Sequence, residues 1–349
     1  MTPDLSRITV SDPFGAGADP QLPSVALALS PAEVRAEFKH RLPRLAGQEG
    51  WVRVRAIQVT RHKPGKRCVI EYDVRVRQAD APPLKTTLIG KIRARRFGNE
   101  GYRLLDALWN AGFQGGSADG VSVPEPIGVI SRFQMWVQRK VCGEVATRLM
   151  SEPGGLALAR RVAEAIHKLH RAGVPTDRQH TMADELRILH QCLPVVTQSH
   201  PALAGRIGRI LQGCDRLGAR LPTPKSCGIH RDFYPAQVIV DRARLCLIDF
   251  DLYCEGDPAL DVGNFIGHLT AASVRASGNA AALRDREEAM EERFVELAGE
   301  TTSRRAVDVY TTLTLTRHIY LSTQSPEGAP VTTRFVELCE ERLAEAGVL

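Results

Sequence analysis

The N-terminal part of the chain alternates hydrophobic and polar residues with the two-residue period of β-strands. From Ile70 to Val76 every second residue is hydrophobic, and each residue between them is charged. This spacing places one set of side chains on a single face of a strand. Five segments of strand-like character are predicted, at residues 51–60, 68–76, 86–93, 126–130 and 134–138.

Helix signals flank these strands. Ser30–Glu33 has a capping serine, a proline in the first turn and a glutamate three residues after the cap, so we predict a helix to about Arg41. Another helix is predicted from Asn99, where large apolar residues follow at helical spacing. Residues 1–30 are rich in Pro, Gly, Ala and Asp and predict an irregular arm.

From residue 139 the pattern changes to the 3.6-residue period of helices. Seven helices are predicted, at residues 156–172, 182–196, 203–221, 259–272, 281–298, 305–323 and 333–346. The sequence therefore predicts an α+β protein in three parts. These are an arm and helix (1–50), a small lobe with a five-stranded antiparallel sheet and a helix (51–138), and a larger helical lobe interrupted by a β-hairpin (139–349).

The hairpin carries the most informative side chains. Two apolar segments, 238–240 and 245–248, flank a polar turn, and folding them together brings Asp249 beside Gln237. Carboxylate and amide oxygens at that end suit Mg²⁺. Asp232, in the turn just before, is placed to accept the proton of a substrate hydroxyl. Two acids and an amide in this order indicate metal-assisted phosphoryl transfer.

The same residues carry a family resemblance. His230, Asp232 and Ile248–Phe250, followed by Gly256–Asp261, resemble the catalytic core of the aminoglycoside phosphotransferase and choline kinase superfamily, small-molecule relatives of protein kinases. The resemblance implies a two-lobed protein-kinase-like fold. It also implies a kinase that uses ATP or GTP with Mg²⁺ to phosphorylate a hydroxyl group of an aminoglycoside, an amino sugar or a metabolite.

One residue departs from the family pattern. The family has asparagine where this chain has Gln237, whose amide is one methylene further from the backbone. Because Mg²⁺ demands near-ideal geometry, the longer side chain can weaken or reshape the metal site. The alternative hypothesis is therefore a pseudokinase that acts as a nucleotide-binding or scaffolding protein. A protein kinase is disfavoured, since the chain lacks a Gly-rich loop and no Ala-Pro-Glu follows Asp249.

Residues 61–67 join the first two predicted strands, at the place of the nucleotide-covering loop of kinases. Lys63, Lys66 and Arg67, together with backbone N–H groups of the turn, would attract phosphate there. A solvated basic turn is the alternative, because a Pro-Gly pair forms such a turn without any ligand.

Lys91, late in the third strand, resembles the kinase lysine that contacts the α- and β-phosphates. Glu100 starts the following helix on the face of its leucines and would turn toward Lys91. The alternative for Lys91 is an exposed strand residue, with Arg93 on the same face contacting the phosphates in its place. The alternative for Glu100 is a carboxylate at the helix start that the helix dipole favours. Backbone amides of the linker 138–141 would hold the adenine.

The resemblance places the acceptor near the catalytic loop. Glu255 and Asp257 would face a cationic substrate, although Asp257 is also suited to cap the next helix. Asp261 is expected to brace the loop, and His230 and Arg231 to fix it through hydrogen bonds.

The composition of the chain excludes few classes of protein function. The net charge of +6 is modest and dispersed, so a nucleic-acid partner is not indicated. No apolar segment is long enough to span a membrane or resembles a signal peptide, which predicts a cytoplasmic protein, with its oligomeric state left open. The eight cysteines form no CxxC pair and are expected to be reduced and buried.

Overall fold

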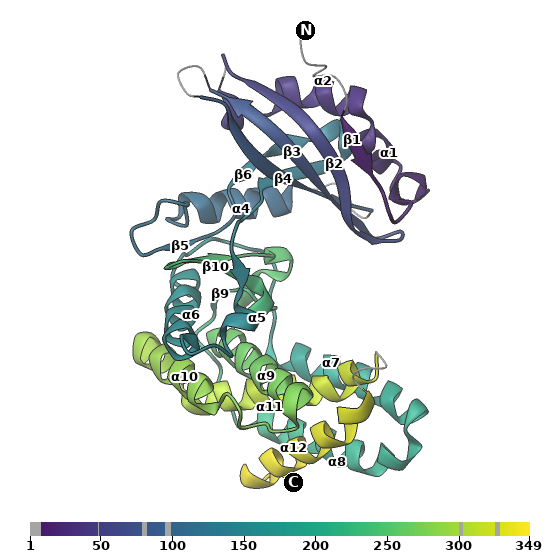
Figure 1. Cartoon of the computed structure of the whole chain (residues 1–349). Coiled ribbons are helices and arrows are strands. Elements are labelled where there is room, and N and C mark those ends of the chain that lie inside the picture. Colours follow the sequence, from purple (N-terminus) through teal and green to yellow (C-terminus); the bar gives the residue numbers. More distant parts are fainter. Residues whose placement is uncertain (1–7, 48, 79–81, 95–98, 300–302, 325–328) are drawn as a thin grey trace. The chain divides into compact units, whose positions relative to one another are not determined.

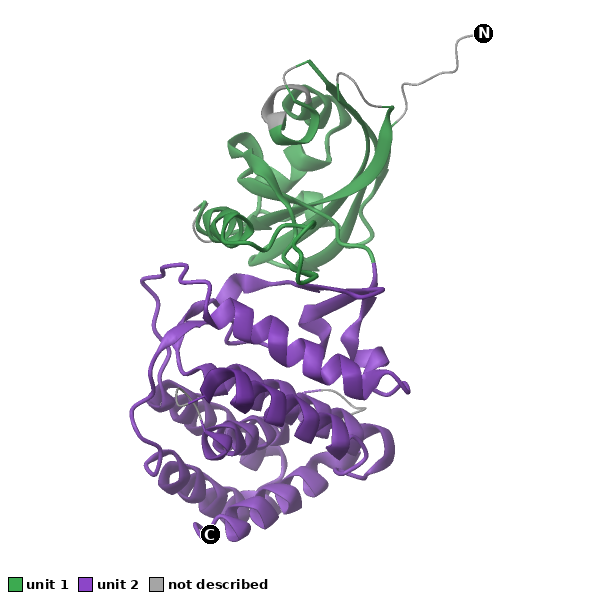
Figure 2. Cartoon of the chain, turned by 90° about the vertical axis from the view of Figure 1, so that its left-hand side faces the viewer, with its two compact units in different colours: residues 1–142 green, residues 143–349 purple. Residues whose placement is uncertain are grey.

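The computed structural model describes residues 8–47, 49–78, 82–94, 99–299, 303–324 and 329–349. The chain divides into two compact units, Met1–Cys142 and Gly143–Leu349, which are coloured separately in Figure 2. They are called unit 1 and unit 2 below.

A six-stranded sheet in the order β1-β2-β3-β4-β7-β6 forms the centre of unit 1 (Figure 1). Its strands are β1 (Thr9–Ser11), β2 (Trp51–Lys63), β3 (Arg67–Arg77), β4 (Leu84–Arg93), β6 (Pro126–Ile130) and β7 (Met135–Arg139). The five strands predicted from the sequence are present, and all their pairings are antiparallel. The sixth, β1, was not predicted and pairs in parallel with β2.

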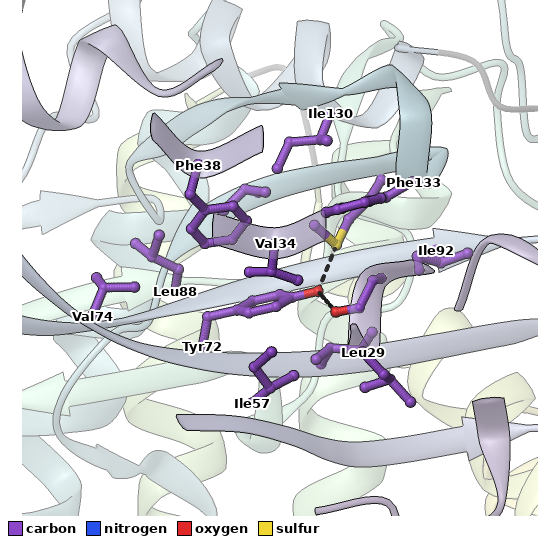
Figure 3. Close-up of a cluster of buried hydrophobic side chains, with 14 of the residues drawn as sticks. Leu29, Val34, Phe38, Ile57, Tyr72, Val74, Leu88, Ile92, Ile130 and Phe133 are labelled. Carbon is purple, nitrogen blue, oxygen red and sulfur yellow. Dashed lines mark hydrogen bonds between the residues drawn. The ribbon is translucent and has the colours of Figure 1, made fainter. Parts of the chain in front are cut away.

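One face of this sheet is buried, and we call it the core face. The hydrophobic residues that alternate through Ile70–Val76 all lie in this core (Figure 3). The Tyr72 hydroxyl donates to the Ala28 carbonyl at 3.0 Å, and its ring centroid lies 4.9 Å from that of Phe38. These contacts hold the segment that precedes β2 against the core face.

That segment is not the irregular arm that its composition predicted. Besides β1 it contains a 3-10 turn (Ala16–Ala18), α1 (Ser24–Leu29) and the predicted helix α2 (Pro31–Arg41). Leu22 and Val25 are buried in the core of unit 1. The elements of this segment before α2 are too short to give a periodic signal, and burial against the sheet stabilises them.

The remaining elements of unit 1 include the helix predicted from Asn99. They are α3 (Pro43–Ala46), α4 (Glu100–Asn110), β5 (Val121–Ser122) and a 3-10 turn (Ser131–Phe133). Because α4 packs against β6 and β7, the helix that carries Glu100 is positioned by the sheet.

Unit 2 contains the seven predicted helices, the predicted hairpin and one short helix, α5, that was not predicted. The helices are α5 (Ala146–Leu149), α6 (Gly155–His170), α7 (Met182–Ser199), α8 (Ala204–Gly218), α9 (Pro258–Ser277), α10 (Arg284–Ala298), α11 (Arg304–Ser322) and α12 (Thr332–Glu345). The strands are β8 (Glu144–Val145), β9 (Cys227–Ile229), β10 (Val238–Asp241), β11 (Arg244–Leu247) and β12 (Cys254–Gly256). Strand β10 pairs with β11 and β8, and β9 pairs with β12.

Helix α9 is the centre of unit 2 and packs along α11 (Figure 1). A Cβ atom at Gly263 would lie 2.6 Å from the Cβ of Tyr310, so the two helices approach at backbone distance there. Asp257 caps the first turn of α9 by accepting a hydrogen bond from Ala259 N at 2.9 Å. This close packing fixes the position of α9, which carries two residues bonded to the loop that contains Asp232.

Two further expectations can be compared with the structure. All eight cysteines are free thiols, and five of them are buried, while Cys142 is exposed. Within the described ranges, no helix has the length and hydropathy needed to cross a membrane.

The contact between α9 and α10 leads to a prediction on stability. Thr270 Oγ1 donates to Glu287 Oε1 at 2.7 Å, and burial raises the pKa of Glu287 from 4.5 to about 7. An acid whose folded-state pKa is raised stabilises the fold below its unfolded pKa, and this contribution is lost as the pH rises through 7. We expect Glu287→Gln to raise the free energy of unfolding by about 1–2 kcal/mol at pH 8, with a smaller gain at pH 5.

Urea denaturation at the two pH values measures this difference. Glu288→Gln, at an exposed position in the same helical turn, is the matched control and should change stability equally little at both. A gain for Glu287→Gln that is the same at pH 5 and pH 8 would contradict the prediction.

Candidate active site

The hairpin brings the two predicted metal ligands to one end. Val238 pairs with Leu247, and the N–H of Ile248 donates to the Gln237 carbonyl at 2.9 Å. Gln237 is the last residue of a 3-10 turn before β10, and Asp249 follows Ile248 directly. Main-chain pairing alone therefore places these two side chains at the same end of the hairpin.

The donor set at this end fits a magnesium ion. Gln237 is 5% exposed, and its main-chain N–H and carbonyl are bonded to Tyr234 and Ile248. The oxygen of this residue that would bind a metal ion is therefore that of the side-chain amide. Amide and carboxylate oxygens are hard ligands that suit Mg²⁺. Among the described residues, no group of three or more His, Cys, Asp or Glu is arranged to hold a metal. A cation at this end would therefore complete its coordination with phosphate oxygens and water.

Backbone strain marks the same region. Asp249 has φ 65° and Arg231 has φ 69°, both in the left-handed region that non-glycine residues rarely adopt. Each such residue costs on the order of 1 kcal/mol and persists where the surroundings hold it. Both coincide with the predicted site, since Arg231 precedes the predicted base Asp232 and Asp249 is a predicted metal ligand.

Asp261, on the first turn of α9, holds the loop that contains Asp232. Its buried carboxylate accepts the N–H of His230 at 2.8 Å and the N–H of Arg231 at 2.7 Å. It also accepts a hydrogen bond from Nε2 of His170, at the end of α6, at 2.8 Å. The expectation that Asp261 braces the loop is confirmed, and the same contacts explain how Arg231 is kept in its strained conformation.

His230 links this loop to the strand that leads to Asp249. Its Nε2 lies 2.9 Å from the carbonyl oxygen of Ile248 and must donate to it, because a carbonyl only accepts. Nε2 is therefore not available to take a substrate proton. The predicted role of His230 as a residue that fixes the loop is confirmed.

Asn264, one turn after Asp261 on α9, holds the other side of the loop. Its Nδ2 donates to the Phe233 carbonyl at 2.9 Å, and its Oδ1 accepts from Arg317 at 2.7 Å. Asp232 is partly exposed and lies between two residues whose main chains are both bonded to α9. The loop thus presents Asp232 from a fixed backbone.

Two residues of this network, His170 and Arg317, were not predicted to contact the loop region. The signal for Asn264 was present, because a polar residue three positions after Asp261 lies on the same face of a helix. His170 and Arg317 come from distant helices, and no local pattern connects them to the loop.

The predicted phosphate-binding cations of unit 1 share one face of the sheet, opposite the core face. Lys63 pairs with Arg67, which pairs with Arg93, so three cations lie in a row across β2, β3 and β4. Lys91, two residues before Arg93, projects from the same face. Lys66, in the turn, is exposed.

Fewer backbone N–H groups of the β2–β3 turn are available to bind phosphate than the sequence suggested. In the turn, Gly65 N donates to the Asp19 carboxylate at 2.8 Å, and Lys66 N donates to the Lys63 carbonyl at 2.9 Å. These two groups are therefore not available to phosphate, contrary to expectation. The side-chain cations of this turn remain the candidates for binding phosphate.

In the linker 138–141, too, backbone N–H groups that were expected to bind a ligand are already hydrogen-bonded. The N–H groups of Arg139 and Lys140 donate to the carbonyls of Glu125 and Thr87, both at 2.9 Å. The expectation that amides of residues 138–141 hold an adenine is wrong for these two, because both are already bonded within unit 1.

Lys91 and Glu100 are positioned by a shared neighbour. The Lys91 ammonium lies 4.9 Å from the centroid of the Trp136 ring on β7, and α4, which begins at Glu100, packs against β7. Glu100 is exposed at the first position of that helix. An ion pair between Lys91 and Glu100 stays a prediction.

The two acids expected near the acceptor differ in exposure, since Asp257 is buried and Glu255 is partly exposed. Asp257 is 7% exposed, caps α9, and is also hydrogen-bonded to Tyr310, so it does not face a substrate. Glu255 is partly exposed on β12, where its main chain is bonded to Arg178 and His180.

The central role of Asp261 can be tested directly. Replacing Asp261 by Asn removes the charge and turns an amide NH₂ toward N–H donors, so we expect a loss of about 2–4 kcal/mol in the free energy of unfolding. Hydrogen exchange at residues 230–233 should accelerate. The control is Asp241→Asn in the exposed turn of the same hairpin, which should change stability by less than about 0.5 kcal/mol. Equal stability of the two variants would show that Asp261 does not hold the loop.

Comparison with known proteins gives an independent assignment. No curated protein sequence matches the chain. Many solved structures are similar to it at low sequence identity, and three of them serve as examples. A putative aminoglycoside phosphotransferase from Ralstonia eutropha JMP134 has a TM-score of 0.56 and 14% identity, over 87% of this chain and 96% of that one. A choline kinase from Cryptosporidium parvum Iowa II has a TM-score of 0.54 and 14% identity, over 84% and 91%. A glucosamine kinase in complex with glucosamine, ADP and inorganic phosphate has a TM-score of 0.54 and 15% identity, over 83% and 81%.

These likenesses confirm the predicted kinase-like α+β fold. The sequence model of the phosphotransferase enzyme family matches residues 94–294, which are more than half of the 349 residues. The match includes the Asp232 loop, the hairpin and the first turns of α9. The chain therefore belongs to the phosphotransferase enzyme family.

Proposed function

We propose that this protein is a kinase that transfers the terminal phosphoryl group of ATP or GTP to a hydroxyl group of a small molecule, with Mg²⁺. The observation that carries the proposal is the geometry around the hairpin. Gln237 and Asp249 share one end of it, and Asp232 lies in a loop bonded to α9 on both sides. Family membership supports phosphoryl transfer as the reaction class.

The residues of unit 2 would divide the chemistry between them. Gln237 and Asp249 would hold Mg²⁺, which when bound neutralises charge on the phosphate oxygens. Asp232 would orient the acceptor hydroxyl and take its proton. Because its loop is already fixed by Asp261 and Asn264, little reorganisation would accompany the reaction.

The residues of unit 1 would bind the phosphates. Lys63, Arg67 and Lys91 project from one face of the sheet, and Lys66 lies in the adjoining turn. Glu100 would orient Lys91, as the kinase resemblance implies.

The acceptor is proposed as a small hydroxyl compound such as an aminoglycoside, an amino sugar or a metabolite. The similar structures include a glucosamine kinase with glucosamine bound and a choline kinase, whose named acceptors both carry a hydroxyl and a cationic nitrogen. Glu255, partly exposed beside the catalytic loop, would suit such a cation.

The test is ADP or GDP release over a panel of hydroxyl compounds, with and without Mg²⁺. We expect Asp232→Asn to lower kcat by about 10²–10⁴-fold, because the proton acceptor is lost. Asp249→Asn should raise the Mg²⁺ concentration needed for half-maximal rate. Asp241→Asn, in the exposed turn of the same hairpin, is the matched control and should keep the wild-type rate.

Gln237→Asn separates the kinase from the pseudokinase. If the longer side chain impairs the metal site, shortening it should raise the rate or lower the Mg²⁺ requirement. Nucleotide binding by the wild type without turnover, and without any gain in Gln237→Asn, would favour a nucleotide-binding pseudokinase. Unchanged turnover in Asp232→Asn would rule out the proposed base.

A further inference from the structure

We propose that Asp19, in the segment before β2, is a positioning residue that orients the cationic β2–β3 turn for nucleotide phosphates. The proposal rests on the function proposed above for this turn, defined as Lys63–Lys66. It assigns a role to a residue about forty positions earlier in the chain, in a segment that sequence reasoning took for an irregular arm.

A bulge in β2 decides which side chains near the turn face the core. The register shifts between Val59 and Arg61, after which His62 pairs with Cys68 and Lys63 pairs with Arg67. Cys68 is fully buried on the core face, so His62 points to that side and Lys63 to the opposite side. Because alternation has a period of two, holding His62 inward holds Lys63 outward.

Asp19 supplies the contact that holds His62 inward. Its Oδ2 lies 2.8 Å from His62 Nε2 and also accepts the N–H of Gly65 at 2.8 Å. The side chains of His62 and Asp19 are 7% and 5% exposed, so the pair is screened from water. One carboxylate oxygen therefore ties both the end of β2 and the turn itself to the preceding segment.

The segment that carries Asp19 is itself fixed. The Asp12 carboxylate accepts the N–H groups of Ala16 and Gly17 at 3.0 and 2.9 Å, which closes the 3-10 turn before Asp19. Gln21 N donates to Asp19 Oδ1 at 2.9 Å. The hydrogen bonds of Gly65 and His62 thus lead to a segment that is itself hydrogen-bonded and packed into the core of unit 1.

Gly65 is suited to this turn because its φ of +64° lies in the left-handed region that favours glycine. The side chain of Gln21 lies beside it, since a Cβ atom at Gly65 would be 2.2 Å from Gln21 Oε1. The preceding segment is packed directly onto the turn, and the N–H of Gly65 donates to Asp19. Phosphate recognition is thereby left to side chains whose direction Asp19 sets.

The test compares Asp19→Ala and His62→Gln with the wild-type full-length protein. Hydrogen exchange followed by mass spectrometry should be faster across residues 60–68 in Asp19→Ala. The dissociation constant for MgADP and the nucleotide KM should each rise by about tenfold. The acceptor KM should not change, and kcat should fall by less than about threefold. His62→Gln keeps the Asp19–Gly65 bond and should show a smaller effect of the same kind, and thermal unfolding checks that both variants fold.

Asp73→Asn is the matched control, since it removes an exposed carboxylate from β3, where it is bonded to Thr87. It should leave exchange at residues 60–68 and nucleotide affinity unchanged. Unchanged nucleotide affinity in both test variants, whatever their exchange, overturns the positioning role. Failure of the wild type itself to bind nucleotide overturns the proposed function and this role together, which distinguishes the two outcomes.

Discussion

The arrangement of unit 2 depends on one buried carboxylate, that of Asp261. It accepts hydrogen bonds from two consecutive backbone N–H groups, at His230 and Arg231, and from the His170 side chain. A buried charge is tolerated only when it is well satisfied, and three donors meet that condition. The carboxylate in turn links α6, α9 and the loop before the hairpin.

This anchoring makes local strain possible. Arg231 and Asp249 both have left-handed backbone conformations, each at a cost that the chain on its own would avoid by relaxing. Arg231 is held by its bond to Asp261, and the Ile248 carbonyl, just before Asp249, is held by His230. Asn264 adds a second attachment through Phe233. At Arg231 and Asp249, unfavourable backbone geometry therefore coincides with specific hydrogen bonds to the adjacent main chain.

Unit 1 shows a comparable balance in its electrostatics. The row from Lys63 through Arg67 to Arg93 concentrates positive charge on the face opposite the core face. A carboxylate, Asp19, lies on the core side of the same turn and is bonded to His62 and Gly65. The Gly65 N–H and the His62 side chain hold the pKa of Asp19 below its usual value, so it remains charged at neutral pH. The turn is thus cationic on its outer face and tied down by an anion on its inner face.

Much of the fold was readable from periodicity. The alternation through Ile70–Val76 predicted a strand with one buried face, and the apolar segments around the 241–244 turn predicted the hairpin that joins Gln237 to Asp249. These predictions succeeded because both involve residues close in sequence, where main-chain geometry alone decides which side chains meet. The capping role of Asp257 was predictable for the same reason.

Contacts between distant segments were decided only by the tertiary structure. The bond between His170 and Asp261 spans 91 residues, and that between Asp19 and His62 spans 43. The occupation of the turn and linker amides by Asp19, Glu125 and Thr87 also depends on packing that no local pattern encodes. By itself, the sequence determined most of the helices and strands, and it determined that Gln237 and Asp249 lie at the same end of the hairpin. The tertiary structure decided which backbone groups are already bonded and which remaining side chains can meet a ligand, because hydrogen bonds between distant segments form only once the packed core has brought those segments together.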